Sequence, residues 1–123
     1  MATRSLIAIS NNNGSFEAIY CHWDGYPRGV GKVLFEHYTD YEKIRKLIYT
    51  GDVSSFDENG VPNHYTEGNT EKVYCKDYDD LMNLAYNVCA EFVYMFSADI
   101  GWQYVQYRPG NNNYESLAEY FCK

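Results

Sequence analysis

Apolar and polar residues alternate in two stretches near the start of the chain, a period typical of β-strands. The run Ser5–Ser10 predicts a first strand, and Phe16–Trp23 alternates as its return strand. Asn13-Gly14 between them is a residue pair that favours a tight turn. We therefore expect the chain to open with a β-hairpin.

A helical spacing replaces the alternation after this hairpin. Val30, Val33 and Leu34 fall on one side of a first predicted helix. Thr39, with Glu42 three residues later, forms a capping box that predicts a second helix to about residue 50.

The second half of the chain predicts a loop followed by mixed elements. Residues 52–70 are polar and rich in Gly, Asn and Ser, so a long surface loop is expected there. A strand is predicted over Glu71–Asp77, followed by a helix over residues 79–89 that is capped by Tyr78 or Asp79. A second hairpin is predicted from Phe92–Ser97 and Trp102–Arg108, and a final helix over Tyr114–Phe121. The predicted order is ββααβαββα. It indicates an α+β fold with an antiparallel sheet of about five strands, made of two β-hairpins plus one strand, and helices packed mainly on one face.

Composition narrows the class of protein. The chain has 123 residues, 46% of them hydrophobic and 18% aromatic, which indicates one folded domain over residues 1–123 rather than a disordered segment. No secretory leader is evident, and no apolar stretch approaches the ~20 residues of a membrane helix. We expect a cytoplasmic protein without membrane contact, in which the four cysteines stay reduced.

Charge is negative and unevenly distributed. The formal net charge is −7, and ten acidic but two basic residues lie between Leu47 and Asp99. This balance disfavours direct nucleic-acid binding. The acidic segment is interpreted either as a solvated face or as a patch for a basic protein partner.

The segment 22–32, His-Trp-Asp-Gly-Tyr-Pro-Arg-Gly-Val-Gly-Lys, carries the candidate ligand site. It lies where a strand ends and a helix begins, and helix starts present free N–H groups to phosphate. The aromatic rings of Trp23 and Tyr26 can stack on a base, and the Asp24 carboxylate can accept hydrogen bonds from ribose hydroxyls. The cationic side chains of Arg28 and Lys32 can bind phosphate oxygens. Gly29 and Gly31 let a ligand approach the backbone closely. Arg108, at the end of the last strand, is an additional candidate.

A structural interpretation of the same residues stays open. Trp23 and Tyr26 would then belong to the core, the glycines to a tight turn, and Arg108 to the surface. The spacing of Gly25 and Gly29 to Lys32 does not fit a P-loop, and G-x-G-x-x-G is absent.

No catalytic or metal motif is evident. The sequence lacks G-x-S-x-G, and the spacing of His22, Asp24 and His37 does not require a metal. We expect no cofactor, no metal and no enzymatic activity.

The second predicted hairpin carries aromatic residues on both faces. Alternation places Trp102 and Tyr104 on one face and Val105 and Tyr107 on the other. We expect helices to cover only one of these two faces. A second copy of the chain would cover the other aromatic face, so we predict a homo-oligomer.

The N-terminal part of the chain resembles a family of small proteins from phages and prophages. The residues that carry the resemblance are Ala2–Ile7, Ile19–Pro27, Val30–Lys32 with Leu34, His37–Thr39 and Gly51–Ser55. They make up a little under half of the chain, and the run His-Trp-Asp-Gly-Tyr-Pro is the most specific part.

This resemblance implies a phage accessory protein that inhibits bacterial immunity inside the host cell. One implied mechanism is a non-enzymatic sponge that sequesters a nucleotide immune signal, as anti-Thoeris proteins do with cyclic ADP-ribose isomers. The alternative is an anti-CRISPR protein whose acidic surface occludes a Cas effector, so that the partner is a host immune protein.

Overall fold

A computed structural model describes residues 3–64, 71–111 and 113–121. The chain order is β1 (Ser5–Ser10), β2 (Phe16–Cys21), η1 (Pro27–Gly31), α1 (Lys32–His37), α2 (Tyr41–Tyr49), β3 (Val53–Phe56), β4 (Pro62–His64), β5 (Val73–Cys75), α3 (Tyr78–Asn87), β6 (Phe92–Ser97), β7 (Gly101–Gln106), β8 (Glu115–Ser116) and α4 (Leu117–Phe121). The α+β class is confirmed, and so are the two hairpins β1–β2 and β6–β7.

Within the described residues, the sheet is mixed and has eight strands, so the prediction of a five-stranded antiparallel sheet is wrong. Its order is β4-β3-β2-β1-β6-β7-β8, and β5 pairs separately with β2. The central strands β1 and β6 are parallel, in a register that runs from Ser5 opposite Phe92 to Ile9 opposite Phe96. A shorter parallel contact joins Cys21 of β2 to Val53 of β3. Both parallel partners come from distant parts of the chain, which alternation within single strands does not reveal.

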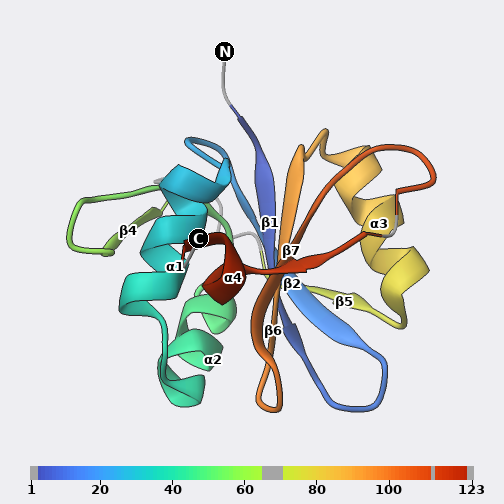
Figure 1. Cartoon of the computed structure of the whole chain (residues 1–123), viewed down its shortest axis with the longest axis horizontal. Helices are drawn as coiled ribbons and strands as arrows, with labels where there is room; N and C mark the ends of the chain where they lie inside the picture. The colour runs from blue at the N-terminus through green and yellow to red at the C-terminus, as the bar shows by residue number, and fades with distance from the viewer. Residues whose placement is uncertain (1–2, 65–70, 112, 122–123) are drawn as a thin grey trace.

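Helices cover both faces of this sheet, not mainly one. Helices α1, α2 and α4 lie on one side and α3 lies on the other (Figure 1). The first side buries Ile7, Leu34 and Tyr94, and the second buries Leu6, Leu81 and Val105. A central strand covered on both sides is apolar at consecutive positions, as Leu6-Ile7-Ala8-Ile9 is.

The loop predicted over residues 52–70 contains two strands, β3 and β4. A tight turn joins them, in which the Asp57 carboxylate accepts hydrogen bonds from the backbone N–H groups of Asn59 and Val61. Gly60 completes the turn with a φ of +79°. Both strands are short and polar, so their sequence resembles a loop. Residues 65–70 lie outside the described residues.

Helix starts differ from the prediction by one to three residues. The second helix has Asp40, not Thr39, at its N-cap, and that side chain makes no capping bond. The third helix is capped by Asp77, whose carboxylate accepts from the Asp80 N–H at 2.8 Å. The final helix begins only at Leu117, because the residues before it pair with β7 as strand β8.

No helix among the described residues has the length and apolar character needed to cross a membrane. Cys21 and Cys75 are buried free thiols and Cys89 is an exposed one, whereas Cys122 lies outside the described residues.

Candidate functional site

The chain makes a strained turn between β2 and α1, where the sequence predicts the ligand site. Asp24 has a φ of +58°, a conformation that aspartate tolerates better than most residues. The next N–H, of Gly25, donates to the Thr3 carbonyl at 2.8 Å. A Cβ at Gly25 would lie 2.7 Å from that same carbonyl oxygen. This glycine therefore serves backbone packing rather than approach of a ligand.

Most N–H groups at the helix start are already bonded to backbone carbonyls and are not free for an anion. The N–H of Gly29 donates to the Tyr26 carbonyl at 2.9 Å, and the N–H of Val30 donates to the Asp24 carbonyl at 2.7 Å. A longer bond of 3.5 Å joins the Gly31 N–H to the Tyr26 carbonyl. The segment is a π-helical turn, η1, and these three of its N–H groups already have backbone acceptors. A phosphate here would be held mainly by side chains.

A pocket of about 250 Å³ nevertheless lies beside this turn, and we call it the Trp23 pocket. It brings together five of the predicted residues, namely Trp23, Asp24, Arg28, Gly29 and Lys32. The remaining lining comes from η1, α1, the end of β3 and the β3–β4 turn: Val30, Val33, Glu36, His37, Phe56, Asp57 and Glu58. The indole of Trp23 is 46% exposed, so it is available as a stacking surface.

The charge in the Trp23 pocket is mixed. Arg28 and Lys32 are its cations, whereas its carboxylates are Asp24, Glu36, Asp57 and Glu58. The carboxylates outnumber the cations, so they disfavour a ligand with many phosphates. The same carboxylates are suited to accept hydrogen bonds from sugar hydroxyls.

Three predicted residues lie outside the Trp23 pocket. Tyr26 is exposed at its edge, with its hydroxyl 3.4 Å from an Asp24 carboxylate oxygen. Gly31 is buried, and a Cβ there would lie 3.2 Å from the ring of Tyr94. Arg108 lines a different hollow, together with Tyr104 and residues 109–111.

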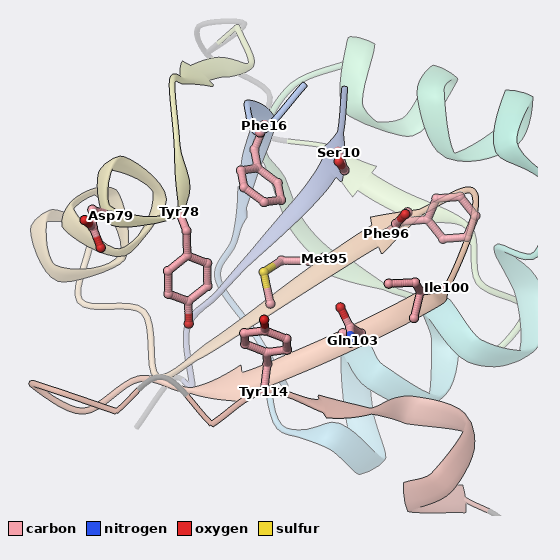
Figure 2. A pocket seen from close by; sticks show the side chains of 11 residues that line it. Ser10, Phe16, Tyr78, Asp79, Met95, Phe96, Ile100, Gln103 and Tyr114 are labelled. Atoms are coloured by element: carbon pink, nitrogen blue, oxygen red, sulfur yellow. The ribbon is translucent and has the colours of Figure 1, made fainter. Parts of the chain in front are cut away.

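A larger pocket, of about 600 Å³, lies on the α3 side of the sheet, and the sequence did not predict it. We call it the sheet pocket. Its walls are the start of α3, the β6–β7 turn and the side chain of Tyr114 (Figure 2). The lining is mainly apolar and consists of Ser10, Gly14, Phe16, Tyr78, Asp79, Met95, Phe96, Ser97, Ile100, Gln103 and Tyr114.

Small side chains on the sheet account for the volume of the sheet pocket. Ser10 and Ser97 end the neighbouring strands β1 and β6, on the face that α3 covers farther along. Helix α3 has ten residues and leaves this end of the face open. A sequence signal existed, because a small polar residue, Ser10 or Ser97, follows the last apolar position of each of two buried strands.

No cysteine is among the described residues that line the two pockets. Burial raises the pKa of the Cys21 thiol to about 12 and that of Cys75 to about 11, so both stay protonated at neutral pH. Across residues 3–64, 71–111 and 113–121, no three His, Cys, Asp or Glu side chains are grouped to hold a metal ion.

Comparison with known proteins adds no assignment. No family model matches the chain, and neither a curated protein nor a solved structure matches it. The two pockets therefore define the candidate sites of this α+β domain.

Proposed function

We propose that this protein is a phage-encoded, non-enzymatic anti-defence protein that sequesters a nucleotide-derived immune signal in the Trp23 pocket. The observation that carries this proposal is the convergence of Trp23, Asp24, Arg28, Gly29 and Lys32 on one hollow. The phage origin and the anti-defence role rest on the resemblance of the N-terminal part of the chain.

The size of the pocket limits what it encloses. Ligand pockets commonly measure about 300–1,000 Å³, so a hollow of about 250 Å³ fits one nucleoside or mononucleotide portion of a ligand. We infer that the base stacks on Trp23 and that the sugar hydroxyls donate to Asp24. One phosphate then lies between Arg28 and Lys32, and the rest of a larger signal stays outside.

Thermal unfolding with AMP, ADP-ribose and a cyclic ADP-ribose isomer tests the proposal. A ligand at about one hundred times its Kd stabilises the folded state by ~2.7 kcal/mol, which raises the Tm by about 5 °C or more. Trp23→Ala and Arg28→Ala should abolish that shift. Tyr86→Ala removes another exposed aromatic ring, on α3, and should leave the shift intact. No shift with any of the three ligands would contradict the proposal.

Glu58→Gln is a variant that should strengthen ligand binding instead of weakening it. Glu58 is exposed in the β3–β4 turn and lines the pocket, so its charge repels a phosphate without supporting the fold. Its neutralisation should tighten binding of AMP about two- to threefold at low salt. An equal gain for adenosine, which has no phosphate, would show that the effect is not electrostatic.

Recovery of the ligand separates a sponge from an enzyme. Protein purified from cells with active immune signalling should release its ligand chemically unaltered on denaturation. A changed product would instead indicate catalysis.

The alternative of occlusion by an acidic surface receives less support. Asp57 and Glu58 lie beside β4, whereas Asp77, Asp79 and Asp80 begin α3 on the opposite side of the sheet (Figure 1). The acidic segment therefore does not present one continuous face. A salt-sensitive complex with a Cas effector, weakened by charge reversal at Asp79 and Asp80, would favour this alternative.

A further inference from the structure

We propose that the sheet pocket is a second binding site, independent of the Trp23 pocket, for a flat uncharged molecule that carries a carboxamide-like group. With a volume of about 600 Å³, it falls within the range of small-molecule sites, and its lining combines an apolar floor with a few polar groups. Each part of this ligand class follows from a particular feature of the lining.

The apolar part of the ligand follows from the walls. Phe16, Met95 and Tyr114 present two rings and a thioether around the opening (Figure 2). Ile100 stands at the β6–β7 turn with 64% of its surface exposed. Exposed apolar surface next to a hollow marks a site that gains free energy when an apolar ligand covers it.

The carboxamide follows from the hydrogen-bonding groups. The oxygens of Ser10 and Ser97 already accept from the N–H groups of Asn12 and Asp99, at 3.2 and 3.3 Å. Each serine therefore keeps its hydroxyl proton for a ligand carbonyl. Within the described part of the chain, the half-buried amide of Gln103 has no hydrogen-bond partner. An amide has one acceptor and two donors, so it pairs with a second amide through two bonds.

Tyr78 adds an unsatisfied donor at the wall of the sheet pocket. Its hydroxyl is buried and has no partner among the described residues. Buried polar groups are normally paired. The Tyr78 ring already packs against the ring of Tyr114, with centroids 5.9 Å apart. A ligand therefore reaches this hydroxyl only when the Tyr114 side chain moves aside.

The absence of negative charge on the ligand follows from the start of α3. Asp79 lines the pocket, and Asp77 and Asp80 lie in the same turn of the chain. The carboxylates of Asp77 and Asp80 already accept from the Asp80 and Lys76 N–H groups, so the helix end has little to offer an anion. An anionic ligand would meet repulsion here.

A matched pair of probes tests the proposal, 2-naphthamide and 2-naphthoate, which differ in charge but hardly in shape. In an NMR titration of the whole chain, 2-naphthamide should bind with a Kd of about 0.1–1 mM. It should shift the backbone amide signals of Met95, Ser97 and Gln103. Binding of 2-naphthoate should be at least about tenfold weaker, because Asp79 repels its carboxylate.

Two glutamines on β7 provide the variants. Gln103→Leu should weaken 2-naphthamide at least about fivefold, since it removes both amide bonds. Gln106→Leu makes the same change on the same strand, outside the pocket, and should leave the affinity unchanged. Equal binding of both probes, or an unchanged affinity in Gln103→Leu, would overturn the proposal. Loss of 2-naphthamide binding in Trp23→Ala would also overturn it, because the probe would then occupy the other pocket.

Discussion

At the scale of single residues, close backbone contacts in the segment between β2 and α1 leave no room for a side chain at Gly25 or Gly29. Asp24 adopts a left-handed conformation, and its carbonyl accepts from the Val30 N–H across the whole turn. A Cβ at Gly29 would lie 2.2 Å from that carbonyl oxygen, in direct conflict with backbone. The glycines of this segment thus allow the tight backbone turn beside which the Trp23 pocket forms.

We expect Gly29→Ala to destabilise the protein by about 3 kcal/mol, because neither the turn nor the carbonyl has room to move. Gly14→Ala is the matched control. A Cβ there meets nothing within 4 Å, so the only cost is its φ of +90°, about 1 kcal/mol. Urea unfolding followed by circular dichroism measures both. Equal costs would show that the contact with Asp24 does not limit this position.

At the scale of elements, the short helix α3 depends on its cap. Asp77 is the only N-cap among α1, α2 and α3 whose side chain makes a capping bond within the described residues. Helix α3 is also the helix that covers Leu6, Val93 and Val105. Its first turn forms one wall of the sheet pocket, so the cap supports both the core and the pocket.

Asp77→Ala should therefore lower the free energy of unfolding by about 1 kcal/mol. Asp79→Ala, in the same turn but without a capping bond, should change it by less than about 0.5 kcal/mol. The two variants remove the same charge, so their difference in urea midpoint isolates the cap. A larger loss in Asp79→Ala than in Asp77→Ala would mean that another residue caps the helix.

At the scale of the whole molecule, two cores share one sheet, and each buries groups that resist ionisation. Burial raises the pKa of Cys21 to about 12 and of Cys75 to about 11. Burial likewise raises the pKa of Tyr104 to about 12, and that of Tyr94 above its ordinary value. The unfolded chain releases these protons near pH 9 for the thiols and near pH 10 for the phenols.

The stability should consequently depend on pH only on the alkaline side, as far as these groups are concerned. Their contribution is complete below about pH 9 and is lost as the pH rises toward about 12, because the unfolded chain then holds fewer protons. Urea unfolding at pH 8 and at pH 10.5 should show a lower midpoint at the higher pH. Cys21→Ala should reduce this difference, and an unchanged pH dependence in that variant would exclude Cys21 as a contributor.

The oligomeric state is also a property of the whole molecule, and it depends on what covers the second face of the sheet. The face of β7 that carries Val105 and Tyr107 is covered by α3 of the same chain, so it does not require a partner. The reason for predicting a homo-oligomer is thereby removed, and the oligomeric state stays untested. Light scattering during gel filtration measures it directly.

Local patterns predicted the two hairpins with good accuracy. The strand Ser5–Ser10 and the strand Phe92–Ser97 have the predicted ends, since each combines β-forming residues with a turn signal beside it. Asn59-Gly60 is the same kind of signal as Asn13-Gly14, and it marks the turn between β3 and β4. The two strands beside that turn were not predicted, because strands as short as β3 and β4 have too few residues to show an alternating pattern.

The candidate site divides in the same way. Trp23, Asp24 and Arg28 are close together in the sequence and line one hollow, because a turn brings near neighbours together. Their role in ligand binding stays a prediction. The acidic side chains of the β3–β4 turn were not foreseen there, and the charge of the Trp23 pocket depends on them. The sheet pocket draws on β1, β2, β6, β7 and α3, so no local pattern contains it.

The amino-acid sequence by itself determined the class of fold, the hairpins β1–β2 and β6–β7, and the turn around which the Trp23 pocket forms. Propensity and periodicity act over a few residues, and these features are local. Tertiary structure alone decided the parallel pairing of β1 with β6, the placement of α3 on the second face and the hollow that its short length leaves. Those features depend on which distant surfaces bury each other, and burial is a property of the assembled chain.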